Sequence, residues 1–213
     1  MVRPSISPDH GCDLQQLQRR RKYVLTLGIG LCVLLLMVTA SSWRTWPRVH
    51  ELFEQGGLLL ILLCILGRTW CTLYIGGLKK RELVRKGPYS VVRNPLYLFT
   101  FVGAAGVGAQ SGSIANTLIF GAASLLIFYF VVLQEERFLA AAFPDAFAAY
   151  AARVPRFWPR LSLWEDAGEL LVKPRLVHRT FLDASLFLLA VPITDLIDWG
   201  QHLGWFPVLL YLP

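Results

Sequence analysis

Two short segments concentrate the polar side chains that could do chemistry in this otherwise apolar chain. The first is RKGPYSVVRNPLYLF (85–99), which combines cationic side chains with Tyr89 and Tyr97. The second is the adjacent pair Glu135 and Glu136. Neighbouring helix positions point about 100° apart, so one glutamate can face the protein interior while the other faces the interface. Two unpaired carboxylates would suit a cation, and the faces of tyrosine rings also attract cations.

Two prolines stiffen the first segment. Pro88 and Pro95 fix φ at their own positions and disfavour helix at Gly87 and Asn94. We therefore expect a rigid non-helical loop that ends directly at a membrane span. Free backbone groups near membrane depth are tolerated only where protein covers them or a ligand takes up their hydrogen bonds. The residues alone leave two readings open: a binding site, or a basic connector that contacts anionic lipid.

Arg68 is the clearest charge inside an apolar run. A charge at the centre of a membrane helix costs about 2.5 to 3.5 kcal/mol, so this residue needs a partner or a function. It can snorkel or pair with an acid such as Asp183, or it can line a polar cavity that a substrate uses. For the nearby acids Asp195 and Asp198 we expect helix-end and interfacial solvation rather than a metal site.

The composition indicates a membrane protein with a single domain, residues 1–213. The chain is 55% hydrophobic and only 16% charged, and it contains 7 Trp and 13 Phe, which would leave large apolar patches on a soluble domain. The net charge of +7 is expected to mark cytoplasmic loops and contacts with membrane lipids, not nucleic acid. The four cysteines show no metal-ligand spacing, so a metal is not expected as a partner either.

Hydropathy predicts the elements that must position the polar residues. We expect an all-α polytopic membrane bundle of about five transmembrane helices with a cytoplasmic pocket. No signal-peptide cleavage site follows the first apolar run, so the first helix should stay in the mature protein. The predicted helices cover residues 24–43, 56–75, 96–110, 114–133 and 180–197.

The basic residues orient this bundle by the positive-inside rule. Residues 1–22 form a cytoplasmic N-terminal segment, and 24–133 hold four membrane helices with a basic cytoplasmic loop at 76–95. Residues 134–178 are amphipathic and should lie on the cytoplasmic surface, and 179–213 give the last membrane helix and a far-side interfacial tail. Within the amphipathic region, the helical spacing of its aromatic residues predicts a short interfacial helix that includes Phe143, Phe147 and Tyr150.

The two polar segments also form an ordered pattern. ELVRKGPYSVVRNPLYLF (82–99) followed by EERFLAAAFPDAFAAYAARVPRFWP (135–159) resembles the isoprenylcysteine carboxyl methyltransferase family and its bacterial and phospholipid methyltransferase relatives. The family pattern reads Leu-Val, Gly-x-Tyr, Arg-His-Pro-x-Tyr, Glu-Glu-x-x-Leu, a Phe-Gly and Tyr pair, and Val-Pro-Arg. The match covers residues 74–159, and the motifs occur in the family's order.

The resemblance implies an integral-membrane methyltransferase that uses S-adenosylmethionine at the cytoplasmic face of the bacterial inner membrane. The candidates for a direct part in catalysis are Arg93, Asn94 and Glu135, and Arg68 is a candidate for the substrate site. The residues implied to bind or brace the cofactor are Arg81, Leu83, Val84, Tyr89, Arg93, Asn94, Pro95, Leu96, Tyr97, Glu135, Glu136, Leu139, Tyr150 and Arg156.

The chain departs from the family pattern in three places. Asn94 replaces the family histidine, so this position loses a titratable group. Val131 and Val132 occupy the region where eukaryotic members have an arginine for the prenylcysteine carboxylate, which argues against a carboxylate substrate bound in that way. Pro144 replaces the glycine of the Phe-Gly pair, and this should alter only the local turn.

These features favour methyl transfer to a lipophilic acceptor, which can be an isoprenoid, a lipid headgroup or another hydrophobic small molecule. Two alternatives remain: an NADPH-dependent membrane reductase of related architecture, whose phosphate the basic loop would suit, and a non-catalytic membrane scaffold. The acceptor, the methylated atom and the oligomeric state are left open by the sequence.

Overall fold

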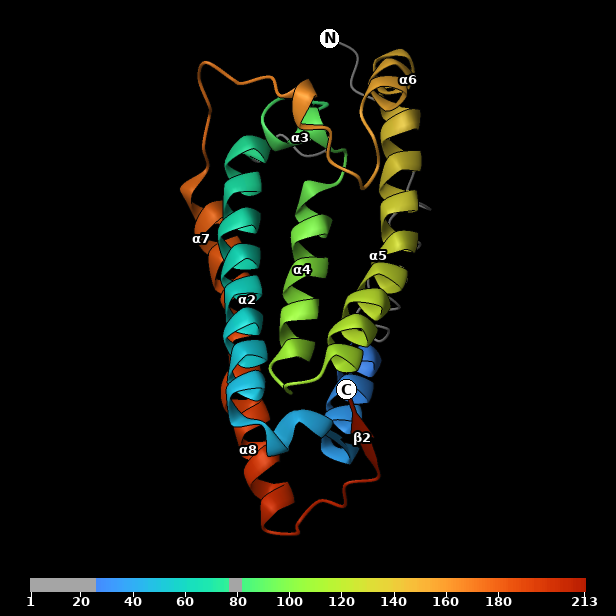
Figure 1. The fold of residues 1–213 in the computed structure, drawn as a ribbon. Helices are drawn as coiled ribbons and strands as arrows, with labels where there is room; N and C mark the ends of the chain where they lie inside the picture. Colours follow the sequence, from blue (N-terminus) through green and yellow to red (C-terminus); the bar gives the residue numbers. More distant parts are fainter. Residues whose placement is uncertain (1–25, 77–81) are drawn as a thin grey trace, which may run out of the picture.

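The computed structural model describes residues 26–76 and 82–213, and these form a helical bundle (Figure 1). Proline opens five of the helices, because its fixed φ suits the first turn and its missing N–H would have no partner there. In chain order the elements are a helix over Thr26–Val38, β1 (Thr39–Ser41), the 3-10 helix η1 (Ser42–Thr45), α2 (Pro47–Ile75), α3 (Pro88–Val91), α4 (Pro95–Ala109), α5 (Ile114–Ala142), α6 (Pro144–Arg153), η2 (Leu161–Leu163), α7 (Pro174–Ser185), η3 (Leu186–Leu189), α8 (Ala190–His202) and β2 (Leu210–Leu212).

The helices α2, α4 and α5 run side by side, and α7 and α8 follow α2 on its other side (Figure 1). Small residues allow α2 and α4 to approach closely: a Cβ on Gly106 would lie 2.7 Å from the carbonyl oxygen of Gly57. The short helices α3 and α6 lie at one end of the bundle, whereas β2 and the C-terminus lie at the other. The two ends therefore offer separate surfaces for polar chemistry.

Within the described residues, three helical segments are long and apolar enough to cross a membrane, namely α2, α5 and the continuous stretch Pro174–His202. Two shorter apolar helices, Thr26–Val38 and α4, lie beside them. Large apolar side chains such as Leu126 and Phe130 face outward, with 62% and 68% of their surfaces exposed, as expected for contact with lipid. The expectation of a mostly helical membrane protein is confirmed, while five complete crossings remain a prediction.

The first predicted span, 24–43, ends earlier than the hydropathy suggests. Its helix stops at Val38, and Thr39–Ser41 form β1, which pairs in parallel with β2 near the C-terminus. Asn116 of α5 donates a hydrogen bond to the hydroxyl of Thr39, and Gln201 of α8 donates one to its carbonyl oxygen. These polar contacts favour an extended segment where composition alone predicts helix. Residues 24 and 25 lie outside the described residues.

Other boundaries also shift. The second span begins at Pro47 rather than at 56, and α5 continues past 133 to Ala142, so the start of the region 134–178 belongs to a long membrane helix. The loop 76–95 is not wholly irregular, because Pro88 opens the four-residue helix α3. Gly87 and Asn94 are non-helical as predicted.

The helix predicted around Phe147 exists as α6, and its apolar face is buried against the protein. Phe147 and Tyr150 are buried and pack with Leu83, Leu139 and Val154. The aromatic spacing of this face therefore serves packing on the protein, and the position of α6 at the membrane surface stays a prediction.

Candidate functional site

Glu136 is the centre of a buried polar network at the α3 and α6 end of the bundle. Its residue surface is only 7% exposed. Asn94 donates a hydrogen bond from Nδ2 to Oε1 of Glu136 at 3.0 Å, and Arg156 donates from Nε and Nη2 to Oε2 at 3.0 and 2.8 Å. Arg93 Nη1 lies 3.4 Å from the same Oε2 atom. One carboxylate thus joins α5, the start of α4 and the segment after α6. The hydrogen bond from Arg156 to this carboxylate raises the pKa of Arg156.

The segment after α6 wraps around the stretch 87–93 through backbone hydrogen bonds. Gly87 N–H donates to the carbonyl oxygen of Glu165 at 2.7 Å, and Arg93 N–H donates to that of Pro155 at 2.9 Å. The hydroxyl oxygen of Ser90 accepts from the N–H of Glu165. Protein therefore covers the free backbone groups of this stretch, as a loop near membrane depth requires.

Gly87 is required by this geometry for two reasons. Its φ of +60° lies in a region that side chains disfavour, and a Cβ would lie 2.1 Å from the ring of Tyr74. The glycine therefore lets the chain turn tightly against α2 before α3 begins.

Tyr89 is buried in α3, and within the described structure its hydroxyl group has no hydrogen-bond partner. Burial, followed by the nearby Cys71, Tyr150, Glu135 and Tyr97, raises its pKa well above the usual value. Tyr150 of α6 donates a hydrogen bond to the carbonyl oxygen of Tyr89 at 2.7 Å, and burial raises the pKa of Tyr150 as well. The two tyrosines are neutral at physiological pH and offer dipoles and ring faces instead of charge.

A cavity of about 620 Å³ is lined by Tyr150 and by residues 82–86, which come just before α3. This volume lies within the range of about 300 to 1,000 Å³ that is usual for small-molecule sites. Both signs of charge line it: the basic residues are Arg85, Lys86 and Arg153, and the acidic residues are Glu82, Glu165 and Glu169. Arg153 and Glu165 form an exposed ion pair at 3.2 Å. A ligand with separate positive and negative groups would fit such walls.

The structure divides the sequence-predicted residues between these neighbouring features. The expectation of two unpaired carboxylates is wrong, because two arginines neutralise Glu136 and Glu135 also interacts with other groups of the protein. Glu135 is the more exposed of the pair and interacts electrostatically with Tyr89. The predicted site residues fall into several groups. The Glu136 network contains Arg93, Asn94, Glu136 and Arg156, and the cavity is lined by Leu83, Val84 and Tyr150. Pro95, Leu96 and Tyr97 begin α4, Leu139 packs against α6, Tyr89 and Glu135 lie near each other, and Arg81 lies outside the described residues.

The pairing suggested for Arg68 does not occur. Arg68 donates from Nη1 to the hydroxyl of Thr100 at 2.5 Å, and its buried Nε has no partner among the described residues. Asp183 instead lies 3.8 Å from Arg179 on an exposed face of α7. Arg68 therefore contacts α4 rather than the last span, because α4 packs between α2 and α5.

The sequence analysis also missed a cluster at the opposite end of the bundle. His50 and Glu54 of α2 meet Asp198 of α8, with the potential ligand atoms all within 4.8 Å of one another. His50 and Glu54 are four residues apart on one helix, and this spacing alone indicates that their side chains are neighbours. Asp198 is far from them in the sequence, so no local pattern indicates that it joins the cluster.

The fold is that of an integral membrane protein, in which a cavity lined by both signs of charge lies at one end of a helical bundle. The model of the phospholipid methyltransferase family matches residues 57–146, which run from α2 into α6 and include Tyr89, Asn94 and Glu136. The protein-S-isoprenylcysteine O-methyltransferase of Schizosaccharomyces pombe is 32% identical over 77 residues, which cover 36% of this chain and 33% of that protein.

Two further relatives match nearly the whole chain. The nickel-cobalt-cadmium resistance protein NccN of Alcaligenes xylosoxydans xylosoxydans is 34% identical over 100% of this chain and 98% of its own length. The cobalt-zinc-cadmium resistance protein CzcN of Cupriavidus metallidurans is 39% identical over 96% of both chains. No solved structure gives a significant match. The chain belongs to the phospholipid methyltransferase family, as the ordered motifs in its sequence indicate.

Proposed function

We propose that this protein is a membrane-embedded methyltransferase that uses S-adenosylmethionine and methylates a lipophilic acceptor. The observation that carries the proposal is that the part of the chain matching the family also forms the polar network and one side of the cavity. The residues that match the family, 57–146, are those whose helices meet at the Glu136 network and close one side of the mixed-charge cavity. Family membership and site geometry thus point to the same end of the molecule.

The residues present fit the chemistry of S-adenosylmethionine. Within the described structure, the hydroxyl of Tyr89 and the Nε of Arg93 are buried without hydrogen-bond partners. Leaving buried polar groups unpaired costs free energy, and a bound ligand could provide the missing partners. The cofactor carries an ammonium and a carboxylate beside its sulfonium. Glu135 can hold a cationic group, Arg85 or Arg153 can hold a carboxylate, and the hydroxyl oxygen and ring of Tyr97 can together face the sulfonium.

When bound, S-adenosylmethionine supplies an activated methyl group that a nucleophilic atom of the acceptor can take by direct displacement. The work left to the protein is alignment and the exclusion of water. Glu136, held by two arginines and Asn94, fixes the start of α4 and with it the position of Tyr97. Asn94 uses its amide N–H in this network and has no group that accepts a proton, so it acts as a positioning residue.

Binding to the purified protein in lipid nanodiscs tests this proposal. We expect isothermal titration calorimetry to detect S-adenosylmethionine binding to the wild type, and the Glu135→Ala, Tyr97→Phe double variant to bind at least tenfold more weakly. Arg137→Gln is the matched control, because Arg137 follows the acidic pair on α5 but is exposed. Equal affinity in the double variant would contradict the site assignment, and a wild type that binds NADPH instead would favour the reductase.

A second inference concerns cellular role, and it rests on the two relatives that match almost the whole chain and are named for metal resistance. We infer that methyl transfer by this protein serves tolerance of divalent metals such as cobalt and cadmium in the bacterial inner membrane, with the site facing the cytoplasm. Growth of a host strain lacking the gene tests this role. The wild-type gene should restore growth on cobalt or cadmium, whereas Glu135→Ala should not; equal growth with and without the gene would contradict it.

A further inference from the structure

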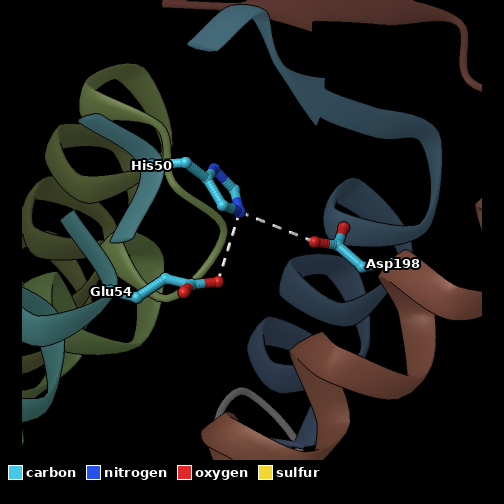
Figure 2. Close-up of side chains that lie close together, drawn as sticks. All are labelled: His50, Glu54 and Asp198. Atoms are coloured by element: carbon cyan, nitrogen blue, oxygen red, sulfur yellow. Dashed lines mark ion pairs between the residues drawn. The ribbon is translucent and has the colours of Figure 1, made fainter. Parts of the chain in front are cut away.

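A histidine and two carboxylates converge at the end of the bundle opposite the proposed methyl-transfer site. Figure 2 shows His50 and Glu54 of α2 facing Asp198 of α8. Nε2 of His50 lies 3.2 Å from Oε1 of Glu54 and 3.8 Å from Oδ2 of Asp198. Ligands about 2.0 to 2.2 Å from a tetrahedral metal ion lie roughly 3.3 to 3.6 Å from one another. The two separations from Nε2 are therefore close to those of a metal site.

A neighbouring arginine orients one of these ligands. Arg44 donates from Nη2 to Oδ1 of Asp198 at 2.5 Å and to Oε1 of Gln201 at 2.8 Å. This contact occupies one oxygen of Asp198 and leaves Oδ2 directed at His50. Groups that hold a ligand from behind in this way are a regular part of protein metal sites.

The imidazole ring of His50 is fixed by its surroundings. Its side chain is 16% exposed, and Nδ1 is buried with no partner among the described residues. The ring lies against Gly112, whose φ is +66° and whose Cβ, if present, would lie 1.9 Å from Nδ1. The turn between α4 and α5 therefore seats the ring so that Nε2, and not Nδ1, faces the two carboxylates.

The surroundings of the cluster are acidic. Glu54 interacts electrostatically with Glu51, Asp195 and Asp198 in addition to His50. With His50 neutral, these four carboxylates and Arg44 leave about three negative charges among the named groups. A cation at the centre of the cluster would relieve this repulsion more fully than one protonated imidazole.

We propose that His50, Glu54 and Asp198 bind a divalent first-row transition metal ion such as Zn²⁺ or Co²⁺. One imidazole nitrogen and two carboxylate oxygens are a borderline ligand set, which suits these ions better than Mg²⁺ or Ca²⁺, for which oxygen ligands are usual. Three protein ligands leave at least one coordination position for water or an exogenous ligand. This site revises the expectation from the sequence that the protein has no metal partner.

The metal site is independent of the proposed methyl transfer. Its three ligands lie outside residues 57–146, the part that matches the methyltransferase family. Along α2, the distance from Glu54 to Tyr74 at the cavity is about 30 Å, at a rise of about 1.5 Å per residue. Metal binding and cofactor binding can therefore be measured separately, and a negative result for one leaves the other proposal unaffected.

Titration of the untagged, metal-free protein in nanodiscs with Zn²⁺ and Co²⁺ tests the site. We expect wild type to bind one equivalent that His50→Gln and Glu54→Gln each weaken at least tenfold. Bound Co²⁺ should give visible absorption bands without a thiolate charge-transfer band, because the described cysteines lie elsewhere. His178→Gln is the matched control, since His178 is an exposed histidine outside the cluster.

Two results would overturn the proposal. Wild-type binding that neither variant weakens would place the ion elsewhere, and the absence of binding to wild type would leave the cluster as a network of polar contacts without a metal. Glu54→Gln keeps the proposal testable if His50→Gln fails to fold, because the Glu54 side chain is 34% exposed and glutamine preserves its shape.

Discussion

Nδ2 of Asn94 donates a hydrogen bond to Oε1 of Glu136 across 3.0 Å, and this contact joins the first turn of α4 to α5. The family histidine is replaced at this position by a group that can donate to the buried carboxylate at any physiological pH. Asn94 therefore holds the start of α4 against α5 without a titratable group.

The contact predicts an ordered set of stabilities for variants of Asn94. Asn94→Asp would place a second buried carboxylate against Glu136, whereas Asn94→Ala only removes a donor. We expect Asn94→Ala to lose about 1 to 3 kcal/mol and Asn94→Asp to lose more. Thermal unfolding in one detergent would measure both, and an Asp variant as stable as the Ala variant would contradict the role of the buried donor.

Removal of the Glu136 carboxylate should be more damaging. Glu136→Ala leaves Arg93, whose side chain is 13% exposed, without its counter-charge, and the loss expected for breaking a buried pair is about 3 to 5 kcal/mol. Arg137→Ala, on the exposed neighbour, should change stability by less than about 0.5 kcal/mol. Thermal unfolding again provides the measurement, and similar shifts for both variants would argue against the network.

Gly87→Ala should disrupt the turn before α3. The substitution combines a positive φ with a Cβ 2.1 Å from the Tyr74 ring, so α3 and Tyr89 must shift. We expect a lower unfolding temperature and at least tenfold weaker binding of S-adenosylmethionine. Gly168→Ala is the control at the same end of the molecule, because nothing lies within 4 Å of its added Cβ; equal effects of the two substitutions would be inconsistent with this geometry.

The buried tyrosines predict a loss of stability at alkaline pH. The pKa values of Tyr89 and Tyr150 are raised above 10.0, so both stay protonated in the folded protein while the unfolded chain ionises. Their contribution is complete below about pH 10 and falls above it by about 1.4 kcal/mol per pH unit for each tyrosine. Unfolding curves recorded from about pH 8 to about pH 11 should show a shallower decline for Tyr89→Phe, and parallel declines would contradict the assignment.

Hydropathy and local sequence rules predicted much of the helical framework. The start of α5 at Ile114 and the non-helical Gly87 and Asn94 follow from local signals, namely the Ser113 cap and the prolines at 88 and 95. The end of the first helix at Val38 does not, because β1 depends on pairing with β2, more than 160 residues later in the sequence.

In the candidate site, too, local motifs could be predicted from the sequence and contacts between distant segments could not. The order of motifs placed Asn94 and Glu136 in one site, but it could not show that Arg156 neutralises Glu136, since this depends on how the segment after α6 folds back. The cluster of His50 and Asp198 was missed for the same physical reason, because its members meet only when α8 packs beside α2.

The most direct measurement of the central claim is methyl transfer itself. Nanodiscs with wild-type protein and the lipids of the native host would be incubated with S-adenosylmethionine labelled with tritium on its methyl group, and the organic extract would then be counted. The account predicts label in a lipophilic product with wild type and Arg137→Gln, and at least tenfold less with the Glu135→Ala, Tyr97→Phe double variant. Label at the level of empty nanodiscs for the folded, cofactor-binding wild type would contradict it.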